Sequence, residues 1–190
     1  MTRRDLIKLL TLHGSFAIAA FAPVAARGKE KPTPLATKGD KLFTQFSLYY
    51  EKGHHLTTNY RVGILVPINT GVEFVKANKK TITVKIPSYT TEVDFENVEN
   101  YSGEKIDGIF KRTFGREAVE LSGFTEGEQS AIKRGVVEVG MRKAAVLKAL
   151  GFPPSHKTPA LSMDQWRYWK NRFNTLLVSF ENDKVITILD

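Results

Sequence analysis

The side chains best suited to chemistry are two adjacent histidines, His54 and His55, which lie three and four residues after Glu51. A metal site needs three or four converging ligands. The chain has no cysteine, and His156 is about a hundred residues away in sequence. We therefore expect an exposed polar loop at His54-His55, with no metal and no cofactor. A weak hydrolase that uses one of these two histidines is one hypothesis to test.

Three acidic residues, Glu92, Asp94 and Glu96, alternate along one segment and would share one face of a strand. Carboxylates placed in this way can bind calcium or act as an acid/base pair. No opposing acidic segment is evident, so the pattern predicts a solvated strand face. The chain also lacks the Gly-x-Ser-x-Gly motif of serine hydrolases. The sequence therefore predicts a protein without enzymatic activity.

The first 26 residues have the pattern of an export signal. Arg3-Arg4 precedes an apolar run from Leu9 to Val24, and Ala25-Ala26 supplies the small residues that a signal peptidase requires. We expect a signal peptide of the twin-arginine type over residues 1–26, cleaved before Arg27, and a periplasmic mature protein. The apolar run has sixteen residues, whereas a membrane-spanning helix needs ~20. We therefore predict no transmembrane span after processing, and leave open whether the route is twin-arginine or general export.

The chain that follows residue 26 is basic, with a net charge near +6. Outside the cytoplasm, the available polyanions are lipid headgroups and cell-wall polymers rather than nucleic acid. Lysines scattered for solubility explain the charge equally well. The absence of cysteine excludes disulfides and a lipidated N-terminal cysteine.

The pattern of apolar residues predicts an α+β fold with several parts. Residues 27–41 are rich in Lys, Pro and Gly and predict a flexible leader. Residues 42–101 predict a small all-β domain, because short alternating segments are separated by turn residues. The strands expected there are Phe46–Tyr50, Tyr60–Val66, Val72–Ala77, Thr81–Ile86 and Glu92–Glu96.

The segment Arg61–Val75 resembles the opening hairpin of bacterial SH3-like barrels. This resemblance covers about sixty residues and implies a compact barrel with an aromatic groove. Tyr49, Tyr50 and Tyr60 are the aromatic residues that would line it. The alternative, that at least two of the three lie in or beside the core, stays open.

Residues 102–123 predict a bridging helix and a linker. Ser102 is placed to cap a helix, and Gly115 is placed to end it. Between them, one apolar stripe at helical spacing is formed by Ile106, Ile109, Phe110 and Phe114.

Residues 124–190 carry the clearest local signals. Thr125 and Glu128 form a capping box before a helix expected over Glu126–Arg134, which Gly135 ends. A second helix is expected over Arg142–Leu150, with Gly151 as its cap and prolines after it. Three antiparallel strands are expected to follow, giving an ααβββ order: Gln165–Lys170, Thr175–Phe180 and Lys184–Leu189.

These residues resemble the SmpA/OmlA, or BamE-like, family of small outer-membrane lipoproteins. The resemblance rests on Gly140-Met141, the apolar helix that ends at Gly151, Pro153 and the later Trp166-Arg167-Tyr168. It implies two helices on a three-stranded sheet, no enzymatic activity and a supporting role in outer-membrane protein assembly or envelope integrity. Two features depart from the family: the lipidated cysteine is missing, and an additional β domain is present.

The strand around Trp169 predicts a binding surface. Trp166 and Tyr168 share one strand face, and Arg167 and Trp169 share the other. If the first pair is in the core, an aromatic and basic patch lies on the open face, formed by Arg167, Trp169, Lys170 and Arg172. Alternatively, Trp169 is covered by the β domain or the bridging helix.

Together these patterns predict a non-catalytic periplasmic binding or scaffold protein of the bacterial cell envelope, with an envelope protein as its partner. The alternative from a second class is a binding module for cell-wall peptide or anionic lipid, which would use the three tyrosines and the basic surplus.

Overall fold

The computed structural model describes residues 35–190, so the predicted signal peptide and most of the predicted leader lie outside the described residues. The described chain contains both helices and strands, which confirms the α+β class. It builds two hydrophobic cores, one in the N-terminal half and one in the C-terminal half.

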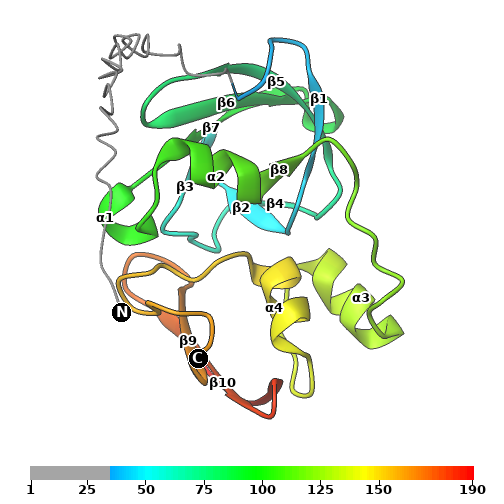
Figure 1. Cartoon of the computed structure of the whole chain (residues 1–190), viewed down its shortest axis with the longest axis vertical. Helices are drawn as coiled ribbons and strands as arrows, with labels where there is room; N and C mark the ends of the chain where they lie inside the picture. Colours follow the sequence, from blue (N-terminus) through cyan, green and yellow to red (C-terminus); the bar gives the residue numbers. More distant parts are fainter. Residues whose placement is uncertain (1–34) are drawn as a thin grey trace, which may run out of the picture. The chain divides into compact units, whose positions relative to one another are not determined.

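A six-stranded sheet forms the N-terminal half, in the order β3-β7-β6-β5-β1-β8. Its pairs are antiparallel except for β3 and β7, which are parallel. The sheet curls over the helix α2 (Figure 1). Its strands are β1 (Lys41–Thr44), β3 (His54–Leu56), β5 (Gly71–Ala77), β6 (Thr81–Ile86), β7 (Thr91–Glu96) and β8 (Phe114–Gly115). A separate antiparallel pair is formed by β2 (Leu48–Tyr50) and β4 (Ile64–Val66), and a 3-10 turn, η1 (Pro87–Tyr89), joins β6 to β7.

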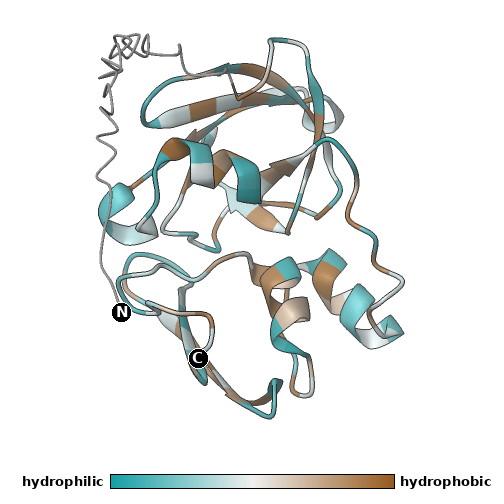
Figure 2. Cartoon of the chain, viewed as in Figure 1, coloured by the Kyte–Doolittle hydropathy of each residue, from teal (hydrophilic) through white to brown (hydrophobic). Residues whose placement is uncertain are grey.

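All five predicted strands are present, and three short strands, β1, β3 and β8, were not predicted. On β6, the alternation places Ile82, Val84 and Ile86 in the core as expected. Thr83 was expected to face water but is only 4% exposed, because its hydroxyl donates to Asp94 Oδ1 on β7 at 2.6 Å. Figure 2 shows hydrophobic and hydrophilic residues alternating along the strands and helices.

Two helices follow the sheet, α1 (Glu99–Ser102) and α2 (Ile106–Thr113). The prediction that Ser102 caps the longer helix is wrong: Ser102 ends α1, and the N-cap of α2 is Lys105, which makes no side-chain capping bond. The stop predicted at Gly115 also comes too late, because Phe114 and Gly115 pair with β1 as β8. The predicted apolar stripe of α2 is buried in the N-terminal core, and Arg112 on the same helix lies 4.7 Å from the ring centre of Phe152 after α4.

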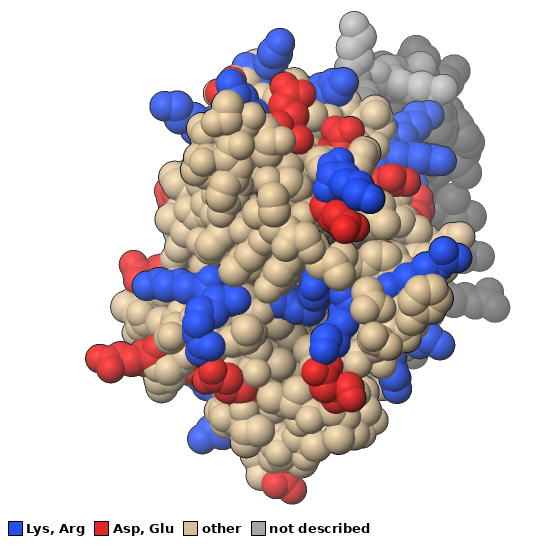
Figure 3. Space-filling model, turned by 180° about the vertical axis from the view of Figure 1, so that it is seen from behind, with Lys and Arg blue, Asp and Glu red and all other residues tan. Residues whose placement is uncertain are grey.

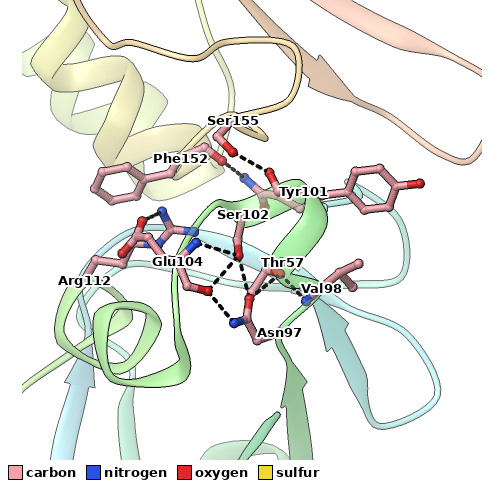
Figure 4. A network of polar contacts seen from close by, with 10 residues as sticks. Thr57, Asn97, Val98, Tyr101, Ser102, Glu104, Arg112, Phe152 and Ser155 are labelled. Atoms are coloured by element: carbon pink, nitrogen blue, oxygen red, sulfur yellow. Dashed lines mark hydrogen bonds and ion pairs between the residues drawn. The ribbon is translucent and has the colours of Figure 1, made fainter. Parts of the chain in front are cut away.

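Ser102 instead belongs to a buried polar network (Figure 4). Its hydroxyl donates to Asn97 Oδ1 at 2.7 Å, and the Asn97 amide donates to the Glu104 carbonyl at 2.7 Å. The Thr57 hydroxyl donates to Asn97 Oδ1 and accepts from the Val98 amide. These bonds join the end of β3, the end of β7 and α1. They leave each of these buried polar groups with a partner, which buried groups require.

The C-terminal half agrees with the predicted ααβββ order. The capping box at Thr125 and Glu128 is present, and α3 (Glu126–Arg134) ends at Gly135 as expected. The helix α4 (Lys143–Leu150) begins one residue later than predicted. The sheet that follows has the order β11-β10-β9. Its strands are β9 (Gln165–Trp169), β10 (Thr175–Glu181) and β11 (Lys184–Leu189).

A charged bond network fixes α3 against α4. Glu128 is 6% exposed, and its carboxylate accepts from the backbone, Nε and Nη2 of Arg142 at 2.9, 3.0 and 2.6 Å. It also accepts from the backbone amide of Thr125 at 3.0 Å. The bonds from Arg142, followed by those from the backbone, lower the pKa of Glu128 to about 2. The capping glutamate therefore holds two helices rather than one.

The two halves meet where the carboxyl ends of α3 and α4 contact the residues just before β2 and after β3. The Ser47 hydroxyl donates to the Ile132 carbonyl at 2.7 Å, and the Ser47 amide donates to the Lys148 carbonyl at 2.9 Å. The Asn59 amide group donates to the Leu150 carbonyl at 2.6 Å. Helix ends leave up to four carbonyls without intrahelical partners. The N-terminal half therefore completes the hydrogen bonding of both helices.

Two glycines allow this close approach. A Cβ on Gly151 would lie 2.6 Å from two ring carbons of Phe46, and the backbone there has φ +73° and ψ −163°, a region that only glycine adopts readily. A Cβ on Gly135 would lie 2.8 Å from Leu65 Cδ1. The glycines therefore serve as helix ends and as contact surfaces for the other half.

The folded chain begins earlier than the predicted leader allows. Ala36 is buried in the N-terminal core, the Gly39 amide donates to the Phe74 carbonyl at 2.8 Å, and Lys41 begins β1. The folded part therefore includes residues 36–40 of the predicted leader, because Ala36 is in the core and the backbones of Gly39 and Asp40 bond to Phe74 on β5. The other predicted domain boundaries stay predictions.

We expect Glu128→Gln to lower the free energy of unfolding by about 2–3 kcal/mol at neutral pH, because it leaves Arg142 without its anion. The native carboxylate has a pKa of about 2 instead of about 4.5, so its contribution is complete above pH 4.5 and is lost as the pH falls toward 2. Urea unfolding at several pH values measures both effects. The matched control is Glu138→Gln, which removes an exposed pair with Arg134 and should cost about 0.5 kcal/mol or less. Equal losses from the two variants would contradict this account.

Gly151→Ala tests the contact between the halves. The new methyl would meet the Phe46 ring and adopt a backbone conformation unsuited to alanine, so we expect a loss of about 3 kcal/mol or more. Gly140→Ala is the control, because Gly140 also has a positive φ, +89°, but has open space around it. We expect about 1 kcal/mol for the control by thermal or urea unfolding. A control loss as large as that of Gly151→Ala would mean that backbone strain alone is responsible.

Candidate binding site

Tyr49 and Arg61 lie at the centre of the contact between the halves. The Arg61 guanidinium lies 4.9 Å from the Tyr49 ring centre, and its Nη2 donates to the Gly135 carbonyl at the end of α3. The Arg61 backbone amide donates to the carbonyls of Trp169 and Lys170 at 3.3 and 3.1 Å. Arg61 is therefore tied to both C-terminal layers, the helices and the sheet.

A cavity of about 350 Å³ lies on one side of Tyr49, and we call it the seam cavity. Half of its lining residues are aliphatic, and its charged groups are Arg61, Lys170 and Asp190. Lys170 Nζ pairs with Asp190 Oδ2 at 2.8 Å. Both halves contribute to the lining, which consists of Tyr49, Arg61, Gly135, Val136, Val137, Leu150, Lys170, Leu176, Ile188 and Asp190.

A second hollow, which we call the tyrosine groove, also includes Tyr49. It has a volume of about 290 Å³ and is lined by Tyr49, Glu51, His54, Leu56, Tyr60 and Val62. Two of the three predicted groove aromatics, Tyr49 and Tyr60, are therefore brought together. Tyr50 is not part of the groove: it is 5% exposed and contacts the Tyr89 ring at 6.4 Å. Adjacent strand residues face opposite ways, which explains why Tyr49 and Tyr50 differ.

The histidine pair lies on a strand rather than in the predicted loop. His54 is exposed and lines the tyrosine groove with Glu51. His55 is buried beside Phe95, with 5.0 Å between ring centres, and its Nδ1 lies 2.7 Å from the Tyr49 carbonyl. A carbonyl only accepts, so Nδ1 carries the proton. Burial lowers the pKa of His55 to about 4, so the ring is neutral and supports Tyr49.

The predicted aromatic and basic patch has a more complex arrangement. Trp166 and Tyr168 are in the core, as the patch requires. Trp169 is half-buried and stacks against His156 at 6.3 Å, and His156 contacts the Tyr101 ring of α1 at 4.6 Å. The expected contact of Trp169 beyond its own sheet is therefore made by the loop after α4.

The three basic residues of the patch differ in their surroundings. Arg167 Nη1 donates to the Thr175 hydroxyl at 3.1 Å, and Lys170 is paired with Asp190 and lines the seam cavity. Arg172 is exposed at the turn between β9 and β10, with its guanidinium 5.8 Å from the Phe173 ring. Of these three basic residues, only Arg172 has no carboxylate or hydroxyl partner within residues 35–190.

Two residues near these sites, Phe173 and Arg61, were not predicted as site residues from the sequence. Phe173 is 82% exposed at the turn, although the prediction named only its neighbours. Arg61 was read as the start of a strand. A phenylalanine between Arg172 and Asn174 in a turn was the available signal for the first, whereas Arg61 has no local signal because its hydrogen-bond partners are 74 or more residues away.

The acidic residues singled out in the sequence lie in one row on a strand. Glu92, Asp94 and Glu96 lie on one side of β7, where Asp94 accepts from Thr83. Within residues 35–190, no group of three or more His, Asp or Glu side chains is placed to hold a metal ion. In the same part of the chain, no helix has the length and apolar character needed to cross a membrane. Lys and Arg side chains form a band across the middle of the face shown in Figure 3, with acidic side chains above and below.

Comparisons with protein-family models, curated proteins and solved structures gave no match to this chain.

The buried state of His55 predicts a pH-dependent stability. Its pKa is about 4 in the native protein and about 6.5 in the unfolded chain, so between these values only the unfolded chain takes up the proton. The free energy of unfolding should therefore fall by up to about 3 kcal/mol as the pH drops from 6.5 to 4. In His55→Asn, which keeps a donor for the Tyr49 carbonyl, this fall should be largely absent in urea unfolding at pH 7 and 4.5. The same slope in both proteins would assign the effect to another group.

Proposed function

We propose that this protein is a non-catalytic binding or scaffold protein of the bacterial cell envelope, acting through contact with another protein. The observation that carries the proposal is Phe173, an aromatic side chain that is 82% exposed at the turn between β9 and β10. Arg172 lies beside it. Aromatic residues and arginine are the types that contribute most to protein interfaces.

The turn holds Phe173 in a defined position. Asn171 Oδ1 accepts from the backbone amides of Phe173 and Asn174 at 2.8 and 2.9 Å, and the Lys170 amide donates to the Asn174 carbonyl at 2.9 Å. A side chain on a fixed turn loses less conformational freedom on binding than one on a mobile loop. The exposed ring therefore has the presentation expected of an anchor residue.

The location and the family assignments are part of the same proposal. Residues 1–26 have the pattern of an export signal, which supports a periplasmic location. For residues 124–190, we propose a BamE-like module, supported by the order of two helices and a three-stranded antiparallel sheet. For residues 42–101, we propose an SH3-like unit. The BamE-like resemblance supports a role in outer-membrane protein assembly or envelope integrity.

A second candidate function is favoured by the tyrosine groove. Tyr49 and Tyr60 lie together with Glu51 and His54, and stacking rings beside polar groups suit a cell-wall peptide. The basic surplus would suit an anionic lipid surface. A weak hydrolase would depend on His54, because His55 is enclosed and neutral.

The proposal is tested by photo-crosslinking in the producing bacterium, with a photoreactive amino acid at position 173 of the full chain. We expect a discrete protein adduct. The yield should persist as the ionic strength is raised through ~0.15 M, because an aromatic contact is not screened by salt. With the photoreactive group at position 169, Phe173→Ser should lower the yield about tenfold or more, since an interface anchor contributes about 2 kcal/mol.

Position 79, in the exposed turn between β5 and β6, serves as the matched control and should give no such adduct. Equal labelling from positions 79 and 173 would contradict the proposal. Adducts with lipid that disappear as the salt concentration rises would support the lipid alternative instead.

A further inference from the structure

The Arg61 guanidinium lines the seam cavity, and the other described residues neutralise its positive charge only in part. Within residues 35–190, no carboxylate lies within ion-pair distance of Arg61. Its Nη1 is buried without a hydrogen-bond partner. Arginine stays protonated in proteins, so this group cannot lose its charge to relieve its burial. A buried guanidinium without an anion is costly, and such sites are therefore candidates for ligand binding.

The end of α3 offers Arg61 a partial counter-charge. Its Nη2 donates to the Gly135 carbonyl, and a helix carboxyl end is equivalent to about half a negative charge. The Tyr49 ring at 4.9 Å adds a weaker attraction. These contacts place no full negative charge beside Arg61 within residues 35–190. The Asp190 carboxylate lines the same cavity but is held by Lys170 at 2.8 Å.

The walls next to this charge are aliphatic. Five of the lining residues are Val136, Val137, Leu150, Leu176 and Ile188. They come from the segment after α3, the end of α4 and the inner side of the C-terminal sheet. The volume of about 350 Å³ is at the lower end of the range for small-molecule sites. Such a cavity suits a short aliphatic chain with one anionic end.

We propose that the seam cavity binds an aliphatic carboxylate, with its headgroup paired to Arg61 and its chain against Val137 and Ile188. Phe173 is not part of the cavity lining, although Lys170 both lines the cavity and belongs to the turn that holds Phe173. The ligand would contact both halves of the protein, because Arg61 belongs to the N-terminal half and Ile188 to the C-terminal sheet.

The test uses the purified full chain and three probes of equal chain length: octanoate, octan-1-ol and octylammonium. Methyl NMR reports on the valines, leucines and isoleucine of the lining, and calorimetry gives the affinities. We expect octanoate to shift these methyl signals and to bind about tenfold or more tightly than octan-1-ol, because a hydrogen bond to a charged group contributes about 1.5–3 kcal/mol. Octylammonium should bind more weakly than octan-1-ol, because it places a cation beside Arg61.

Two variants and one control locate the site. Arg61→Gln should weaken octanoate about tenfold or more and leave octan-1-ol unchanged. Arg116→Gln removes an exposed arginine that pairs with Asp40, and it should change neither affinity. Val137→Phe should weaken octanoate and octan-1-ol alike, because it fills the cavity and keeps Arg61.

Equal binding of octanoate and octan-1-ol would overturn the proposal. So would methyl shifts confined to residues outside the lining, or octanoate binding that survives both Val137→Phe and Arg61→Gln. If Arg61→Gln does not fold, the comparison of the three probes and the Val137→Phe result decide the question.

Discussion

The carboxyl ends of α3 and α4 need hydrogen-bond donors, and the segment from Ser47 to Arg61 supplies them. Ser47 reaches both helices, Asn59 reaches α4, and Arg61 reaches the end of α3. The Tyr168 hydroxyl donates to the Gly151 carbonyl from the sheet side, and burial raises the pKa of Tyr168, which keeps this donor protonated. Helix ends that are buried must have such partners. Both halves therefore depend on one set of polar contacts.

This set of polar contacts explains the positions of the seam cavity and the tyrosine groove. A guanidinium is planar and always charged, so it does not pack like an aliphatic side chain, and the residues around Arg61 leave space next to it. Tyr49 stands between the seam cavity and the tyrosine groove, and its backbone is held by His55. Arg112 and Phe152 form a further contact between the halves, at 4.7 Å. Some residues that line the seam cavity and the tyrosine groove thus also connect the two halves.

The sequence predicted best those elements whose signals are local. The start of α3 at Thr125 and its end at Gly135 follow from a capping box and a glycine that act within one turn. By contrast, β8 pairs with β1 across about seventy residues, so Gly115 could be read only as a helix stop. For the candidate site, strand alternation required that Tyr49 and Tyr50 face opposite ways, but only the tertiary structure showed which one faces outward. The hydrogen-bond partner of the Arg61 guanidinium lies at the end of α3 and could not be inferred from the neighbours of Arg61 in sequence.

The strand β8 lies at one edge of the six-stranded sheet, and this position bears on the order in which the chain folds. Every strand of the six-stranded sheet lies before residue 116, whereas the partners of Ser47, Asn59 and Arg61 on α3 and α4 lie later in the chain. Two-residue strands add little by themselves, but this one supplies the last edge strand of the sheet, and it precedes both α3 and α4 in the chain. The first half can thus act as a preformed template whose unused donors guide α3 and α4 into place as they form. Assembly would then proceed from the amino end toward the carboxyl end, as vectorial synthesis favours.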